Sequence, residues 1–204
     1  MRKNLKWSTG EAITATDVVY SWQRVLDPMT AADYAGQLYF VKNAENFNTS
    51  KVNPDTRRKY TANDVAVYTI DAHTVEVELN APTAFFLDLC AFPTLAVVPR
   101  FWIEKHGERW TIEHPVPVSG PYMLEFWKLN DRVRVRANPT HWSGKLPPCR
   151  VVDFIPIKIP TTALNLYETG AADIIWDKSL IPSSLMDVLR KRPDCHTFGY
   201  LGSY

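Results

Sequence analysis

The sequence predicts a mixed fold of helices and sheets, in the α/β class. Three observations support this prediction: an amphipathic helix near the start, two hairpins with alternating polarity, and an alternation of helix and strand signals towards the end. The length of 204 residues, 46% of them apolar and 22% charged, suits one large domain or two small ones. We place a soft boundary near Pro99 and expect one domain over residues 1–99 and another over 100–204.

The first predicted helix has the clearest start signal in the chain. Thr14 and Asp17 have the spacing of a capping box, and Pro28 ends the pattern. The apolar residues between them recur at helical period: Val18, Val19, Trp22, Val25 and Leu26. A weaker helix is expected within residues 31–47.

Polar and alternating segments follow this helical region. Residues 48–64 are polar and interrupted by proline, which predicts a surface excursion. Residues 65–82 alternate between apolar and polar side chains on both sides of Asp71-Ala72-His73, which predicts a half-buried hairpin.

The remaining segments give one prediction each. We expect a short apolar helix at 83–92 and an amphipathic helix at 100–110. Residues 117–142 should form a hairpin that turns at Asn130-Asp131, and residues 150–159 a buried strand. The end of the chain should alternate helix 161–170, strand 172–176, helix 182–192 and strand 195–202.

Charge and cysteine content exclude several classes of function. A net charge of +1 gives no overall field that would concentrate nucleic acid or an anionic membrane. The three cysteines have no C-x-x-C spacing, which argues against a zinc site and a thioredoxin-like motif. Cys90 lies in an apolar run and should be a small buried residue. Cys149 and Cys195 could pair outside the cytoplasm or remain free thiols.

No catalytic or metal-binding pattern is present, so we expect neither an enzyme nor a cofactor site. The five histidines are scattered, and the phosphate-binding loops and nucleophile motifs are absent. Arg132, Arg134 and Arg136 share one strand face, which we interpret as a solvated face rather than a phosphate site. The opening residues lack the apolar core of a signal peptide, and no run is long enough to span a membrane.

Four segments, in this order, resemble the oligopeptide-binding proteins of ABC importers, which are extracellular solute-binding proteins of family 5. They are "KWSTGEAITATDVVYSWQRVLDP", "TVEVELNAPTAFFLDLCAFPTLAVVP", "SGPYMLEFWKLNDRVRVRANPTHW" and "YETGAADIIW". The resemblance covers nearly the whole chain. It implies a fragment of a two-lobe fold like that of periplasmic binding proteins, truncated at both ends. Residues 1–99 would be most of an accessory domain, and 100–204 the central part of the first ligand-binding lobe.

The same resemblance implies a ligand and partners. A peptide would lie extended in a cleft, like an added strand, and this chain would supply one wall. The intact protein would reside in the periplasm or cell envelope and deliver peptides to the membrane subunits of an ABC permease. A receptor-derived interaction module without a transport role is the alternative. Because unpaired strand edges would be exposed, we also expect the fragment to self-associate.

Candidate ligand-binding residues follow from the resemblance position by position. Tyr34 matches a ligand-facing tyrosine of the family, and Phe92 stands where some members have histidine. Trp176 and Asp177 match a strand end that lines the cleft. Residues 200–204 match the entry to the hinge, and Gly202 replaces a disulfide cysteine of some members. We expect Tyr34 and Trp176 to share one exposed aromatic surface, because the sequence places each ring at the end of an element.

Overall fold

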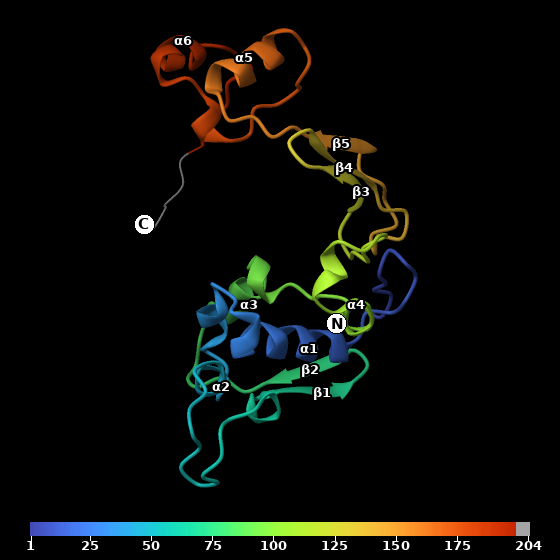
Figure 1. The fold of residues 1–204 in the computed structure, drawn as a ribbon, viewed down its shortest axis with the longest axis vertical. Coiled ribbons are helices and arrows are strands. Elements are labelled where there is room, and N and C mark those ends of the chain that lie inside the picture. The colour runs from blue at the N-terminus through green and yellow to red at the C-terminus, as the bar shows by residue number, and fades with distance from the viewer. Residues whose placement is uncertain (199–204) are drawn as a thin grey trace. The chain divides into compact units, whose positions relative to one another are not determined.

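The computed structural model describes residues 1–198 and divides the chain into two compact units (Figure 1). The first unit contains Met1–Phe126 and Arg134–Val152, and the second contains Trp127–Val133 and Asp153–Tyr204. The last predicted strand extends beyond the described residues, and the hinge segment with Gly202 lies wholly outside them. None of the described helices is long and apolar enough to span a membrane.

The central helix of the first unit is α1 (Ala15–Leu26), and it begins at the predicted cap. The backbone N–H of Thr14 donates to a carboxylate oxygen of Asp17 at 2.8 Å, and the N–H of Asp17 donates to the Thr14 carbonyl at 3.0 Å. Trp22 and Leu26, on the predicted apolar face, are buried. The local sequence signals therefore fix both the start and the buried face of α1.

The predicted first hairpin is confirmed as β1 (Val67–Asp71) and β2 (Thr74–Val77), paired antiparallel. Val67 lies opposite Val77, and Thr69 lies opposite Val75. In Figure 1, α1 lies along this hairpin. The main core forms around them from these buried side chains: Trp22, Leu26, Leu38, Val41, Ala44, Val65, Val67, Phe86 and Leu95.

The single helix expected within residues 31–47 is wrong. The structure has a 3-10 helix, η2 (Ala35–Leu38), and a separate short helix, α2 (Ala44–Asn48). Between them Val41 forms a β-bridge with Leu79, and Asn43 has a positive φ of 65°. Pairing with the hairpin thus takes the chain out of helical geometry.

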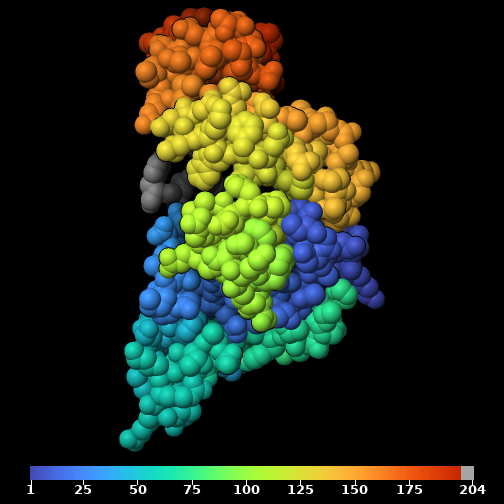
Figure 2. All heavy atoms as spheres, turned by 45° about the vertical axis from the view of Figure 1, so that its right-hand side comes forward, coloured from blue at the N-terminus to red at the C-terminus, as the bar shows by residue number. Residues whose placement is uncertain are grey.

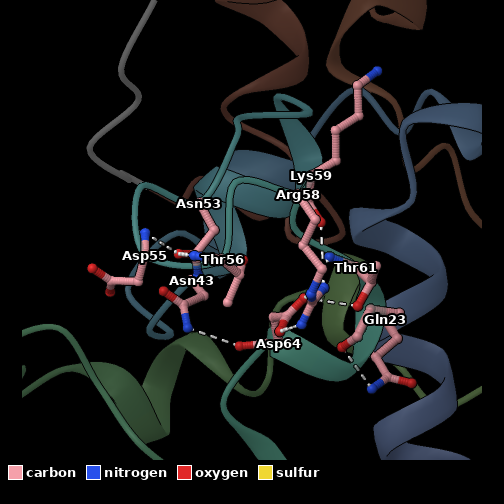
Figure 3. Close-up of polar contacts among 10 residues, drawn as sticks. Gln23, Asn43, Asn53, Asp55, Thr56, Arg58, Lys59, Thr61 and Asp64 are labelled. Carbon is pink, nitrogen blue, oxygen red and sulfur yellow. Dashed lines mark hydrogen bonds and ion pairs between the residues drawn. The ribbon is translucent and has the colours of Figure 1, made fainter.

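The excursion over residues 51–60 projects from the rest of the first unit, and Asp64 anchors its base (Figure 3). Arg58 donates to both oxygens of the Asp64 carboxylate, at 2.8 and 2.7 Å. Thr61 donates to the same carboxylate from its N–H and its hydroxyl, at 2.8 and 2.7 Å. These bonds hold the pKa of the Asp64 carboxyl far below its ordinary value, and the Arg58 hydrogen bonds are the largest cause.

Two further helices of the first unit confirm predicted helices. They are α3 (Phe86–Leu89) and α4 (Arg100–His106). Cys90, at the end of α3, is exposed, which corrects the expectation that it would be buried. The short α3 leaves this turn at the surface. The N-terminal loop lies beside the segment that follows α4, where the N–H of Ser8 donates to the Val118 carbonyl at 2.8 Å (Figure 2).

The second predicted hairpin is confirmed as β3 (Tyr122–Lys128) and β4 (Arg132–Ala137), and β5 (Val151–Phe154) adds to β4 in the order β3-β4-β5. The expectation of a buried strand at 150–159 is wrong, because Val151 and Phe154 are 50% and 58% exposed. An apolar run predicts burial only where a second layer covers it.

The second unit is built mainly from short helices. They are α5 (Pro160–Glu168), α6 (Met186–Leu189) and the 3-10 helices η6 (Lys178–Leu180) and η7 (Ser183–Leu185). No strand forms at 172–176 or over the described part of 195–202. The other 3-10 helices, all in the first unit, are η1 (Pro28–Thr30), η3 (Ala62–Asp64), η4 (Pro93–Leu95) and η5 (Gly107–Thr111).

Candidate functional site

The structure brings together two of the predicted site residues, Tyr34 and Phe92. Their ring centroids are 5.7 Å apart, with the ring planes at 63°, an edge-to-face arrangement. The Tyr34 side chain is 59% exposed, whereas Phe92 is half-buried and packs on the core. Phe92 therefore supports the Tyr34 ring from the side of the core and leaves much of that ring open to solvent.

Side chains of α1 hold the segment that carries Phe92. The indole N–H of Trp22 donates to the Leu95 carbonyl at 3.0 Å. The Ser21 hydroxyl accepts from the N–H of Val98 at 2.9 Å and donates to the Asp17 carbonyl at 2.6 Å. These bonds are buried or partly buried, so the segment after Phe92 is fixed against α1.

Tyr34 is positioned by the turn between α1 and η2. The Asp27 carboxylate accepts from the N–H of Met29 at 2.8 Å, and Ala31 adopts a positive φ of 48°. Asn48 braces the end of α1 by donating from its amide to the Leu26 carbonyl at 2.9 Å. Ala35, directly after Tyr34, is buried, so the chain enters the core immediately after presenting the ring.

An open hollow of about 310 Å³ lies beside Tyr34. One side is the last turns of α1, the second is residues 30–34, and the third is the segment after Phe92. Its lining includes the apolar residues Val25, Pro93, Ala96 and Val98 and the charged residues Arg24 and Asp33. The volume is at the lower end of the range for small-ligand pockets, roughly 300–1,000 Å³. The hollow therefore suits a side chain better than a whole ligand.

Arg24 lines this hollow, but its charged end interacts with two residues that do not line it, Trp110 and Tyr20. Its guanidinium lies 5.9 Å from the ring centroid of Trp110 and is near enough to Tyr20 to influence the charge of that phenol. Burial raises the pKa of Tyr20, and the nearby Arg24 opposes that effect. In contrast, the Asp33 carboxylate has no hydrogen-bond or ion-pair partner among residues 1–198.

Trp176 and Asp177 belong to the second unit. Trp176 is 93% exposed and Ile174 is 71% exposed, whereas Ile175 is half-buried, so the alternation expected of a strand survives without strand pairing. Asp177 caps η6, because its carboxylate accepts from the N–H and the hydroxyl of Ser179, both at 2.8 Å. These bonds, the backbone one first, lower the pKa of Asp177. A surface shared by Trp176 and Tyr34 stays a prediction.

Sequence reasoning did not identify Asp33, Arg24 or Ser21. Asp33 is a single carboxylate in a stretch of small residues, and the hollow beside it joins segments that are far apart in the chain. The only local signal was the position of Asp33 next to Tyr34. Over residues 1–198 no cluster of three or more histidine, cysteine, aspartate or glutamate side chains could hold a metal ion.

Comparison with known proteins decides the family. The family of bacterial extracellular solute-binding proteins, family 5 Middle, matches residues 1–194. The chain belongs to this family. The relatives of this chain are binding proteins of transport systems rather than enzymes, and several of them are named as oligopeptide-binding proteins.

The family-5 chain is similar to two proteins of Escherichia coli K12 and to one solved structure. It is 35% identical to the periplasmic oligopeptide-binding protein OppA over all of this chain and 36% of that protein. It is 30% identical to a probable deoxycholate-binding periplasmic protein, YgiS, over 94% of this chain and 34% of that protein. The structure of Burkholderia pseudomallei OppA has a TM-score of 0.83 at 32% identity, over 94% of this chain and 36% of that one. The chain thus spans about a third of these relatives.

Proposed function

We propose that the chain contributes part of the oligopeptide-binding surface of an extracytoplasmic receptor that serves an ABC permease. The observation that carries the proposal is the exposed Tyr34 ring, which Phe92 supports in a chain similar to oligopeptide-binding proteins. An aromatic ring held in this way offers apolar contact area at little entropic cost, which suits a ligand whose side chains vary. In the intact protein the receptor would work in the periplasm or cell envelope.

Trp176 is the proposed ligand contact of the second unit. Its side chain is almost fully exposed, so it contributes little to packing within the unit. Asp177 supports it indirectly, because the bonds from Ser179 fix the turn that follows the ring. We therefore assign Asp177 a positioning role in peptide binding.

The similarity to a deoxycholate-binding protein makes an apolar, non-peptide solute the second candidate. The test is an NMR titration of the 204-residue chain with a pool of tripeptides to pentapeptides, and separately with deoxycholate. We expect peptides to shift the ring resonances of Tyr34 and Phe92 with weak affinity, because the chain spans only a third of its relatives. Shifts with deoxycholate and none with peptides would favour the second candidate.

Two variants make this titration specific. Trp176→Ala should weaken the peptide response of the second unit, and Trp127→Ala serves as the matched control because Trp127 is another exposed tryptophan of the same unit, at 66%. Equal weakening by both substitutions would argue against a particular role for Trp176. Sub-micromolar binding to the unmodified chain would contradict the view that most of the ligand contacts lie elsewhere.

A further inference from the structure

Two of the polar side chains that line the hollow beside Tyr34, Ser21 and Arg24, already have partners. The Ser21 hydroxyl already donates to the Asp17 carbonyl and accepts from the N–H of Val98. The Arg24 guanidinium interacts with Tyr20 and Trp110. An occupant would therefore meet apolar surface from Val25, Val98 and their neighbours, with the hydroxyl residues Thr30 and Thr94 beside it.

Asp33 is the exception among the charged groups of the hollow. Its carboxylate is exposed and has no partner within the described part of the chain. The Tyr34 ring lies next to it in sequence and lines the same hollow. A free carboxylate and an aromatic ring both attract a cation, the first by its charge and the second by its ring quadrupole.

We infer that this hollow takes a single peptide side chain that has an apolar stem and a cationic end, namely arginine or lysine. The stem would lie along Val25 and Val98, and the cationic end would reach Asp33 and the Tyr34 ring. Arg24 is the cation that opposes this arrangement, and its contacts with Tyr20 and Trp110 draw it away from the occupant. The inference rests on the proposed function and names the side chain that one part of the surface prefers.

The test compares three small probes by methyl NMR of Val25 and Val98: the N-acetyl amides of arginine, citrulline and glutamate. Citrulline has nearly the shape of arginine without its charge. We expect arginine to bind about two- to fivefold more tightly than citrulline, the range for an exposed ion pair, and glutamate to bind most weakly. This preference for arginine should disappear in about 0.5 M salt, because salt screens exposed charges.

Substitution of the carboxylate completes the test. Asp33→Asn should reduce arginine binding to the citrulline level and leave citrulline unchanged. Asp55→Asn is the matched control, since Asp55 is another exposed aspartate of the first unit, in the 51–60 excursion, and should leave both unchanged. Tyr34→Ala should weaken both arginine and citrulline.

Three results would overturn the inference: equal binding of arginine and citrulline, an arginine preference that survives Asp33→Asn, or no probe-induced shift of either valine. Each of these results can be told apart from failure of the proposed function. If only the proposed function fails, the arginine probe still shifts the valine methyls, while the peptide pool leaves the rings of Tyr34, Phe92 and Trp176 unshifted.

Discussion

At the scale of single residues, exposure separates rings that could contact a ligand from rings that stabilise the fold. Trp176→Ala should change the free energy of unfolding by less than about 0.5 kcal/mol, as is usual at a surface position. Tyr34→Ala should cost ~1 kcal/mol, because a largely exposed ring loses its edge-to-face contact with Phe92. Trp22→Ala, in the core, should cost ~3–5 kcal/mol. Urea unfolding measures all three, and a loss in the core range for Trp176 or Tyr34 would make that ring structural.

Asp64 gives a prediction for the effect of pH on stability. Its pKa is lower in the folded protein than in the unfolded chain, so its carboxylate stabilises the fold above the unfolded pKa, about 4. The stabilisation is lost as pH falls below that value. Asp64→Asn should therefore lower the urea midpoint at pH 7, and the difference from the unmodified chain should shrink steadily below about pH 4. A difference that stayed constant down to pH 2 would contradict this account.

Residue identities alone could suggest Tyr34 and Phe92 only through resemblance to a family. Nothing in the spacing of these two residues shows that their rings meet; the structure shows it because Ser21 and Trp22 hold the later segment against α1. Asp33 could not be found from the sequence, since an unpaired carboxylate is recognised by the absence of partners in space.

At the scale of elements, signals carried within one helix or one hairpin predicted structure well, and signals that depend on a partner far along the chain did not. The α1 helix formed where its cap and apolar period indicated, because both act within a few residues. Residues 172–176 kept their alternation and formed no strand, because a strand is completed by pairing with a neighbour. The helix expected within 31–47 was interrupted by pairing of Val41 with Leu79.

The link between α1 and the segment after Phe92 can be tested by removing one hydroxyl. Ser21→Ala takes away the acceptor for the N–H of Val98 and should destabilise the chain by about 1–3 kcal/mol. The Val98 amide should also exchange its hydrogen faster. Thr16→Ala, on the exposed side of the same helix, is the control and should change neither measurement. Unchanged Val98 exchange in Ser21→Ala would show that other contacts hold this segment.

At the scale of the whole molecule, exposed apolar side chains predict self-association. Among the described residues of the second unit, eight large apolar residues are at least 58% exposed: Trp127, Leu129, Phe154, Ile159, Ile174, Trp176, Val188 and Phe198. Exposed apolar patches promote association between copies. We expect light scattering to report an average mass that rises with protein concentration. The double substitution Ile174→Glu with Trp176→Glu should reduce that rise, and a strict monomer at every concentration would contradict the prediction.

The two units should also differ in local stability, because their cores differ. Of the described residues in the second unit, only Ala163 and Pro182 are buried, whereas most of the core residues belong to the first unit. The ion pairs of Arg192 with Glu168 and Asp194 are partly exposed and contribute little. A unit with so little buried apolar surface opens at low free-energy cost.

We therefore expect the amides of α5 to exchange hydrogen well before those of α1, and thermolysin to cleave first within residues 153–198. Peptide binding at Trp176 would order this unit, so a saturating peptide pool should slow both cleavage and exchange there and leave α1 unchanged. Trp176→Ala should remove that protection, while Trp127→Ala should retain it. Equal protection of α5 and α1 without peptide would mean that the second unit is stabilised by interactions other than burial of its own apolar side chains.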